Sequence, residues 1–200
     1  MAVLNFITTN QGKIRSLQGA LDGYDVEVRV QKLDLTEPQY DTVKEVSAFK
    51  ARQAFERLRE PVLVEDGGFV IEALNGFPCF YTKFALKTIG AAGILKLLAG
   101  ESNRRARFIG CASYIDENGR LFQFEREEGM KLEIAGQMAD IDSPYAWSEL
   151  WKILYVPQMG KVMCQLNADE VDELYTTVRG SLQVFAAWYI KRLHQNSTAA

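Results

Sequence analysis

The chain has 200 residues, of which 48% are hydrophobic and 24% are charged, a composition typical of a globular protein with one domain-sized core. A formal net charge of −3 argues against broad nucleic-acid binding, and no apolar run approaches the ~20 residues that a membrane span requires. Three widely spaced cysteines favour reduced thiols over a disulfide framework or a zinc site. We therefore expect a cytoplasmic protein that binds neither nucleic acid nor a membrane.

The first predicted strand covers residues 2–7 and leads into the polar turn Thr8-Thr9-Asn10-Gln11-Gly12-Lys13. Apolar residues then recur at helical spacing at Ile14, Leu17 and Leu21. Either Thr9 or Asn10 is a suitable N-cap for this helix. The N–H groups at a helix start, the helix dipole and the nearby Lys13 together form an anion site. Ordinary capping beside a solvated lysine explains the same residues equally well.

An acidic residue, Glu37, follows a second predicted strand at residues 26–30. Because Glu37 precedes Pro38, its backbone is disfavoured in the helical region, and the segment is expected to be extended or turn-like. Glu37 then projects from a loop. A solvated surface acid is the ordinary interpretation of such a residue.

The next predicted helix takes Ser47 as its N-cap, which puts Lys50 at its third position. Its apolar face is formed by Ala48, Ala51, Phe55 and Leu58. Lys50 lies at the edge of this face, where a lysine that extends its ammonium group to solvent is the usual interpretation. The helix is expected to end before Pro61.

The stretch that organises the chain is Val62-Leu63-Val64-Glu65-Asp66-Gly67-Gly68-Phe69. Its apolar start predicts a short buried strand that ends in the carboxylates Glu65 and Asp66, after which two glycines turn the chain. Ligands of open α/β sheets bind beyond the carboxyl ends of strands, so this pair is well placed to hold a hard cation such as Mg²⁺. A plain turn, with Asp66 bonding its own backbone, accounts for the same residues.

The second half of the chain continues the alternation of helices and strands. The expected elements are a turn at 75–78, a helix at 80–99, a β-hairpin at 108–125, a strand at 130–134 and helices at 168–176 and 180–193. The aromatic segment 143–157 can stack a nucleobase but is more typical of a core or an interface. We predict an α/β fold with a mixed sheet, forming one domain over residues 1–194 with a flexible tail at 195–200.

The order of these features resembles the inosine triphosphate pyrophosphatases, also called the Ham1 or non-standard purine nucleoside triphosphate pyrophosphatase family. Thr8-Thr9-Asn10-Gln11-Gly12-Lys13 is similar to the family's T-x-N-x-x-K phosphate loop. Asp34-Leu35-Thr36-Glu37 resembles its acidic metal-site segment, and Ser47-Ala48-Phe49-Lys50-Ala51 its substrate-lysine segment. Val64-Glu65-Asp66-Gly67-Gly68-Phe69, followed by Ala73-Leu74-Asn75-Gly76-Phe77-Pro78, matches the signature E-D-[ST]-G-L…A-L-x-G-x-P-G.

The last third of the chain departs from the family pattern. Where the family has W-D-P or Y-D-P, this chain has Trp151-Lys152-Ile153, so a base-reading aspartate has become Lys152. The family's late K-N-x-x-S-H-R becomes Glu173-Leu174-Tyr175-Thr176-Thr177-Val178-Arg179, which keeps only the arginine. In the signature, Ser has become Gly67 and the glycine after the proline has become Cys79. The phosphate and metal half is intact, and the base-reading half is rewritten.

The resemblance, which covers nearly the whole chain, implies an elongated domain of two α/β lobes around a long mixed β-sheet, with flanking helices and a central cleft. It also implies a homodimer and Mg²⁺-dependent hydrolysis of a nucleoside triphosphate to a nucleoside monophosphate and pyrophosphate. Its implied metal ligands are Glu37, Glu65 and Asp66, and Asp66 also activates the attacking water. Lys13 and Lys50 are the other implied catalytic residues, since they neutralise the phosphates. The implied substrate contacts are Thr8, Thr9, Asn10, Lys13, Lys50, Gly67, Trp151, Lys152 and Arg179.

Two other functions stay open, and the altered positions motivate the first of them. One is a nucleotide-binding relative that has lost efficient catalysis and has changed its base specificity, and the other is a metal phosphohydrolase with an unrelated substrate. Lys152 and Glu173 have exchanged sign relative to the family and are expected either to pair with each other or to read a different base. This exchange predicts that inosine triphosphate is not the best substrate. If both side chains point to solvent, backbone groups and stacking on Trp151 still select 6-oxopurines.

Overall fold

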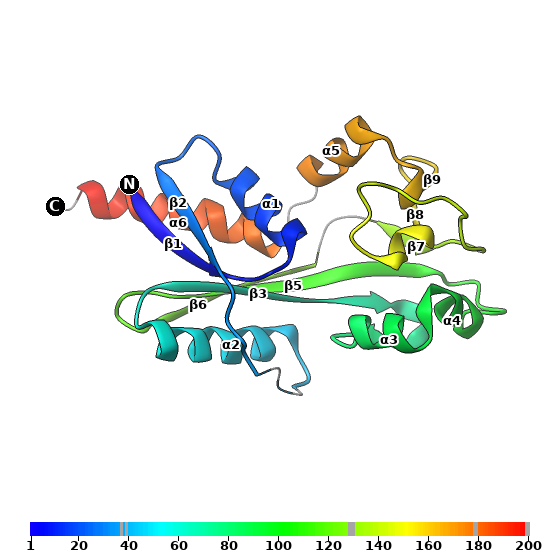
Figure 1. Ribbon diagram of the computed structural model, residues 1–200, viewed down its shortest axis with the longest axis horizontal. Helices are drawn as coiled ribbons and strands as arrows, with labels where there is room; N and C mark the ends of the chain where they lie inside the picture. Colours follow the sequence, from blue (N-terminus) through cyan, green and yellow to red (C-terminus); the bar gives the residue numbers. More distant parts are fainter. Residues whose placement is uncertain (37, 39, 128–130, 178–179, 199–200) are drawn as a thin grey trace. The chain divides into compact units, whose positions relative to one another are not determined.

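The computed structural model describes residues 1–36, 38, 40–127, 131–177 and 180–198. Within these residues, hydrogen bonding joins nine strands in one mixed sheet in the order β2-β1-β3-β5-β7-β8-β9, with β4 paired to β3 and β6 paired to β5. Helices flank the strands (Figure 1), and the predicted α/β fold with a long mixed sheet is confirmed. The two lobes and the central cleft stay predictions.

The chain divides into two compact units. Unit 1 comprises Met1–Asp66, Gly110–Arg126 and Arg179–Ala200, and unit 2 comprises Gly67–Ile109 and Glu127–Val178. The elements of unit 1 are β1 (Ala2–Ile7), α1 (Gln11–Ala20), β2 (Val26–Gln31), α2 (Val43–Leu58), β6 (Leu121–Glu127) and α6 (Ser181–Thr198). Those of unit 2 are β4 (Pro78–Cys79), α3 (Thr82–Thr88), α4 (Gly90–Leu97), β7 (Leu132–Ile134), β8 (Leu154–Val156), β9 (Lys161–Val162) and α5 (Ala168–Thr177). The long strands β3 (Val62–Ile71) and β5 (Arg105–Ile115) contribute residues to both units.

In unit 1, β1 lies between β2 and β3 and runs parallel to both. Successive residues of β3 point to opposite faces of the sheet, as the two-residue period of a strand requires. Leu63 packs in a core cluster with residues of α1 and α6, whereas Val62 and Val64 pack in a second cluster with residues of α2. Figure 1 shows the same layering, with α1 and α6 on one side of β3 and α2 on the other. The two residues that follow Val64 therefore also face opposite sides.

The first helix begins where it was predicted, and the second does not. Asn10, one of the two expected candidates, is the N-cap of α1. The predicted N-cap role of Ser47 is wrong, because α2 begins at Val43 and is capped by Thr42, which forms a reciprocal capping box with Glu45. Ser47 instead lies buried in the second turn of α2, where its hydroxyl donates to a backbone carbonyl of β5 at 2.8 Å. A residue predicted to start the helix therefore fastens it to the sheet.

The signature stretch is a continuous strand and not a strand followed by a turn. β3 runs through both glycines to Ile71, and its second half pairs with β4, with Phe69 opposite Cys79. Gly68 is required by this pairing, since a Cβ atom at residue 68 would lie 2.9 Å from the carbonyl carbon of Cys79. A glycine inside a strand often marks such a close approach of another backbone. The turn predicted at the two glycines is therefore wrong, and Glu65 and Asp66 lie within the strand.

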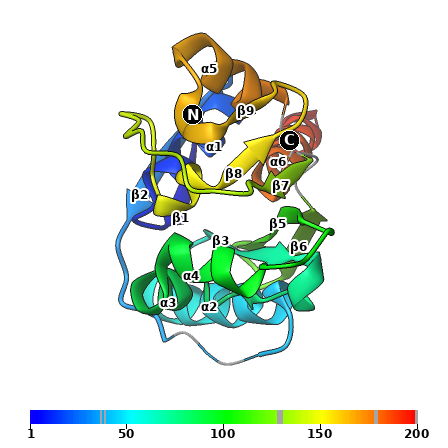
Figure 2. The ribbon, with the colours of Figure 1, turned by 90° about the vertical axis from the view of Figure 1, so that its right-hand side faces the viewer.

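In unit 2, the single helix predicted at 80–99 is two helices, α3 and α4 (Figure 2). The break falls between Thr88 and Gly90, since Gly90, the first residue of α4, has a φ of +66° in the left-handed region, and a right-handed helix cannot run through it. The core of this unit is a cluster of buried side chains that includes Phe69, Ile94, Leu132 and Trp151. No helix in the described ranges is long and apolar enough to cross a membrane.

The predicted hairpin and the last two helices have the expected type and position. β5 and β6 pair with each other, and α5 and α6 cover the two helical stretches predicted near the C-terminus. Helix α6 continues to Thr198, past the predicted start of a tail at residue 195. The division into a domain over residues 1–194 and a flexible tail at 195–200 stays a prediction.

Candidate functional site

Two lysine–carboxylate pairs form on β3 of unit 1. The Nζ atom of Lys13, from α1, lies 2.6 Å from Oε2 of Glu65 and donates to the backbone carbonyl of the same residue at 2.9 Å. The Nζ atom of Lys50, from α2, donates to Oδ2 of Asp66 at 2.7 Å. Two lysines that lie far from each other in the sequence are thus brought to two adjacent carboxylates of one strand, and all four residues were predicted to belong to the site.

The two pairs lie on opposite faces of β3. Glu65 follows Leu63 on the face covered by α1 and α6, and Asp66 follows Val64 on the face covered by α2. This geometry argues against one cation held jointly by both carboxylates, because adjacent side chains of a strand diverge. Among the residues that the structure describes, no three or more Asp, Glu, His or Cys side chains gather as a metal site. The third predicted ligand, Glu37, lies outside the described residues.

The phosphate-loop segment is ordered by its own side chains. Oδ1 of Asn10 accepts hydrogen bonds from the backbone N–H groups of Gly12 at 2.8 Å and Lys13 at 3.2 Å. The Oγ1 atom of Thr8 in turn accepts from the backbone N–H of Asn10 at 3.1 Å, and Thr9 is exposed. The loop therefore presents the positive end of α1 in a fixed conformation, the arrangement that favours an anion.

The Glu65 carboxylate lies in a confined, largely buried position on its face of the sheet. Its side chain is 9% exposed, and its Oε1 atom lies 3.4 Å from the hydroxyl of Ser181 at the start of α6. A Cβ atom at Gly110, on β5, would lie only 2.7 Å from the same oxygen. The carboxylate therefore fits because residue 110 lacks a side chain. Sequence reasoning missed Gly110 and Ser181, which carry no local signal and reach the site only through the fold.

Lys50 and Asp66 are both shielded from solvent on the other face, with 16% of each side chain exposed. Lys50 lies one helical turn after Ser47, so the hydrogen bond that fastens Ser47 to β5 also fixes the part of α2 that carries Lys50. Gly67, predicted to contact the substrate, follows Asp66 in β3.

The predicted base-reading residues of unit 2 occupy two different environments. Trp151 is 0% exposed in the hydrophobic core, so its ring has no accessible face on which a base could stack. Lys152 forms an ion pair with Asp142 at 2.7 Å, so its predicted pairing with Glu173 is wrong. The hydrogen bond to Asp142 and the charge of that residue raise the pKa of the Lys152 ammonium group. Arg179, the remaining predicted substrate contact, lies outside the described residues.

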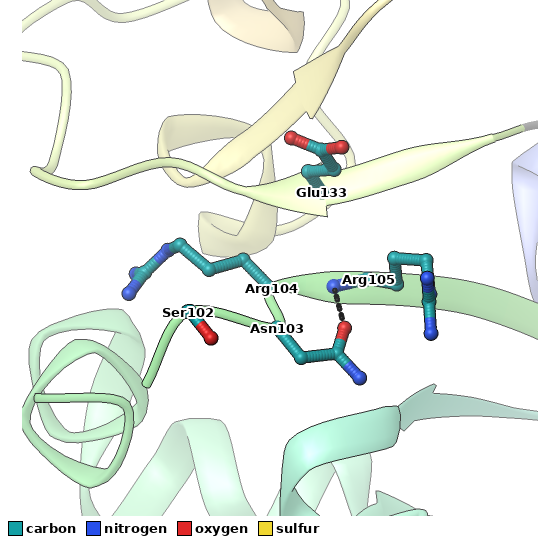
Figure 3. Close-up of a pocket in the computed structure, with 5 residues that line it drawn as sticks. All are labelled: Ser102, Asn103, Arg104, Arg105 and Glu133. Atoms are coloured by element: carbon teal, nitrogen blue, oxygen red, sulfur yellow. Dashed lines mark hydrogen bonds between the residues drawn. The ribbon is translucent and has the colours of Figure 1, made fainter. Parts of the chain in front are cut away.

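A separate pocket of about 330 Å³ lies within unit 2. It is lined by Ser102, Asn103, Arg104, Arg105 and Glu133 (Figure 3). Its two arginines are engaged in structural contacts. Arg104 donates to three backbone carbonyl groups, and Nε of Arg105 donates to Oε2 of Glu72 at 2.7 Å. The pocket shares no residue with the lysine–carboxylate pairs, and we assign it no role in the site.

Comparison with known proteins relates the whole fold to one family. A model described as the Ham1 family matches residues 4–174. The chain is 37% identical over 186 residues to the dITP/XTP pyrophosphatase of Methanopyrus kandleri, a match that covers 92% of this chain and 94% of that protein. It is 39% identical over 132 residues to inosine triphosphate pyrophosphatase 2 of Trypanosoma cruzi, which covers 66% of this chain and 67% of that one.

Solved structures show the same fold at lower sequence identity. The Ham1 protein of Staphylococcus aureus superposes with a TM-score of 0.74 at 21% identity, over 95% of this chain and 99% of that one. A HAM1 protein from Coxiella burnetii superposes with a TM-score of 0.72 at 20% identity, over 96% of this chain and 100% of that one.

Proposed function

This chain belongs to the Ham1 family, and on that premise we propose that it hydrolyses a non-standard purine nucleoside triphosphate to a nucleoside monophosphate and pyrophosphate. The names of the similar enzymes, for dITP, XTP and inosine triphosphate, point to nucleotides with a 6-oxopurine base as the substrate class. The observation in this chain that carries the proposal is the pair of lysine–carboxylate contacts on β3, one of which lies beside a capped helix N-terminus.

Lys13, Lys50 and the N-terminus of α1 supply positive charge for the triphosphate. Phosphoryl transfer needs little covalent help from a protein, and catalysis rests on positioning and on the stabilisation of charge on the phosphate oxygens. In the structure each ammonium group is held by a carboxylate, which keeps it in place before a substrate arrives. Thr8, Thr9 and Asn10 are assigned to the same phosphate loop, with Arg179 as a further phosphate contact and the backbone of Gly67 beside Asp66.

Asp66 is assigned to the attacking water. The water oxygen forms a bond to the α-phosphorus, the bond from the α-phosphorus to the bridging oxygen breaks, and pyrophosphate leaves with the electron pair. A carboxylate in contact with the water orients it and accepts its proton. The hydrogen bond from Lys50 fixes the direction of the Asp66 carboxylate on the face of α2.

Mg²⁺ is the proposed cofactor, and Asp66 on the α2 face has the carboxylate oxygens that suit it. Mg²⁺ keeps several waters and is usually bound through one or two carboxylates together with substrate phosphates, so a full set of protein ligands is not required. Asp66 is the carboxylate assigned to hold it, with Glu37 as the second. Glu65 is left out of this set because its side chain lies on the other face of β3. Bound Mg²⁺ would neutralise phosphate charge and polarise the reacting phosphoryl group.

Two further parts of the proposal concern the setting of the enzyme. Its three cysteines are all free thiols, as expected in a reducing compartment, and we place the activity in the cytoplasm. A homodimer is retained from the resemblance of the sequence. Light scattering of the purified protein tests the dimer directly.

The decisive experiment measures product formation from a panel of triphosphates. Purified protein is incubated with Mg²⁺ and one nucleoside triphosphate at a time: that of inosine, deoxyinosine or xanthosine, or one of the four common ones. The products are identified by phosphorus NMR. The expected products are nucleoside monophosphate and pyrophosphate, with no orthophosphate from a terminal cleavage. Binding of a 6-oxopurine triphosphate in calorimetry with no turnover of any nucleotide would instead support a nucleotide-binding relative.

Asp66→Asn tests the assignment of the water-activating group. We expect turnover to fall by roughly 100-fold or more, since general-base catalysis contributes about that much, while the unfolding temperature stays close to that of the parent. Glu56→Gln is a matched control, because Glu56 is an exposed acid on the same helix as Lys50. A normal rate in Asp66→Asn would remove Asp66 from the mechanism.

A further inference from the structure

The Lys13 ammonium group is attached twice to the same residue. It contacts both the carboxylate and the backbone carbonyl of Glu65, at 2.6 and 2.9 Å. Two contacts to one residue fix both the position and the direction of an ammonium group that otherwise moves on a flexible four-carbon stem. The lysine of the phosphate loop is therefore anchored to the central strand.

We propose that Glu65 is a positioning residue that holds the Lys13 ammonium group in place for the triphosphate, and that Glu65 is not a metal ligand. This rests on the proposed function, in which Lys13 contacts phosphate. Glu65 acts through Lys13 and does not itself touch the substrate.

The burial of Glu65 supports this role. Its side chain is 9% exposed, and its Oε2 atom lies 2.6 Å from the Lys13 ammonium group. Among the described residues, no hydrogen-bond donor meets the geometric criteria for a hydrogen bond to this buried oxygen, so the ion pair with Lys13 is the interaction that offsets its burial. A buried carboxylate separated from its counter-charge is strongly unfavourable, so the pair persists before substrate binds. The ordering of the lysine is then already complete in the free protein, and binding of the triphosphate loses less side-chain freedom.

The opposite orientation of Asp66 supports the second half of the proposal. A cation on the α2 face meets Asp66 and Lys50, whereas Glu65 points to the face of α1 and α6. Among the described residues, the neighbours of the Glu65 carboxylate include Lys13, Ser181 and the glycine at position 110. The Glu65 carboxylate is thus confined beside an ammonium group and a hydroxyl group, and it points away from the face on which Asp66 is assigned to hold Mg²⁺.

Gly110 gives a way to disturb Glu65 without changing a charged residue. A Cβ atom at this position would lie 2.7 Å from Oε1 of Glu65 and 3.1 Å from the hydroxyl of Ser181, but 3.6 Å, an ordinary contact distance, from the backbone oxygen of Asp66. Gly110→Ala therefore pushes the Glu65 carboxylate out of its confined position. If the carboxylate positions Lys13, this substitution has the same effect as Glu65→Gln.

The test compares four variants, Glu65→Gln, Gly110→Ala, Lys13→Gln and the double variant Glu65→Gln/Lys13→Gln, with Glu56→Gln as the control. For each we measure kcat, KM, the Mg²⁺ concentration that gives half-maximal activity, and the unfolding temperature. Glu65→Gln and Gly110→Ala should each raise KM about 10-fold, the scale expected when one rotamer-rich side chain loses its ordering, with no change in the Mg²⁺ requirement. In the Lys13→Gln background, Glu65→Gln should raise KM by less than about 2-fold, because the partner through which Glu65 acts is absent.

Two results would overturn the positioning role. One is a rise in the Mg²⁺ requirement of Glu65→Gln, which would identify Glu65 as a metal ligand. The other is a double variant whose rise in KM equals the product of the rises in the two single variants, which would show that Glu65 acts independently of Lys13.

Calorimetric binding of inorganic pyrophosphate without Mg²⁺ separates this proposal from the proposed function. If no triphosphate is hydrolysed by the parent protein, the function fails. A loss of pyrophosphate affinity in both Glu65→Gln and Lys13→Gln would still support the positioning role. Unchanged pyrophosphate affinity in Glu65→Gln, beside a clear loss in Lys13→Gln, would refute it even in an active enzyme.

Discussion

Asp116 is a fully buried acid in the turn of the β5–β6 hairpin, and its removal has a calculable effect on stability. Its Oδ1 atom accepts from the backbone N–H groups of Asn118 at 3.0 Å and Arg120 at 2.9 Å, and Oδ2 accepts from Arg192 of α6 at 2.7 Å. The ion pair joins the hairpin that carries Gly110 to the helix that begins at Ser181. The contact thus holds together two of the elements that surround Glu65.

Asp116→Asn keeps the acceptor at Oδ1 but puts an amide donor against the Arg192 guanidinium group. The variant loses one charge-assisted hydrogen bond, which is worth about 1.5–3 kcal/mol when it is formed to a charged group. Because 23% of the Arg192 side chain is exposed and can be rehydrated, we expect the lower part of this range, about 2 kcal/mol. For a protein of this size that corresponds to a fall of about 4–8 °C in the unfolding temperature.

The effect of Asp116 should depend on pH in a defined direction. Burial raises the pKa of its carboxyl group, but the hydrogen bonds from Arg120, Arg192 and Asn118 outweigh burial, and the net pKa is lowered. A lowered pKa in the folded protein adds stability that is present above the unfolded pKa of about 3.9 and is lost as the pH falls through the folded value. The difference between parent and variant should stay constant from pH 5 to 8 and shrink below about pH 4.

Urea unfolding at several pH values measures this difference. The matched control is Glu117→Gln, since Glu117 lies 3.8 Å from the same Arg192 guanidinium group but its side chain is 60% exposed, and we expect it to change stability by less than about 0.5 kcal/mol. An Asp116→Asn variant within about 0.5 kcal/mol of the parent at pH 7 would refute the assignment of a stabilising buried pair.

Two further predictions follow from the packing. Gly68→Ala should lower the free energy of unfolding by about 2 kcal/mol in urea titrations, because its Cβ atom would meet the rigid backbone of Cys79; a neutral result would mean that β4 can shift away from β3. All three cysteines should react with a thiol reagent in denaturant, whereas in the native protein only the partly exposed Cys79 should react, and slowly, because burial raises the pKa of its thiol. Rapid native reaction of Cys111 or Cys164 would contradict their burial.

The elements that sequence reasoning predicted correctly are those with complete local signals. β1, the Asn10 cap of α1, the β5–β6 hairpin and the amphipathic α6 each follow from a pattern within about a dozen residues. The capping box Thr42-Val43-Lys44-Glu45 is also a local signal, which the prediction of Ser47 as the cap overlooked. The predicted start of α2 is therefore five residues too late.

The errors around β3 had a cause that is not local. Two adjacent glycines such as Gly67 and Gly68 are typical of a turn. The strand continues through them because it pairs with β4, where the Cys79 backbone lies too close to leave room for a side chain at residue 68. Once the strand is continuous, its two-residue period places Glu65 and Asp66 on opposite faces. The assumption of a turn therefore concealed the fact that one carboxylate contacts Lys13 and the other contacts Lys50.

The last prediction concerns the base. The exchange of a family aspartate for Lys152 predicted altered specificity, on the condition that this side chain reads the base. In the structure the Lys152 ammonium group pairs with Asp142, whose side chain is 92% exposed, so the ion pair lies at the protein surface. A lysine held there by a solvated acid is a poor reader of a buried base edge, and this favours selection of 6-oxopurines by backbone groups, without stacking on the buried Trp151.

We therefore expect Lys152→Ala to change the ratio of kcat/KM for inosine triphosphate to that for guanosine triphosphate by less than about 3-fold, a small fraction of the 10⁴-fold or greater discrimination that buried hydrogen-bonding groups can provide. Asp142→Asn serves as the matched variant, because it removes the partner and leaves the lysine in place. Both ratios are measured by competition in one reaction, which cancels differences in the active fraction of the preparations. A change of 10-fold or more in Lys152→Ala alone would return Lys152 to the base-reading site, and with it the prediction that inosine triphosphate is not the best substrate.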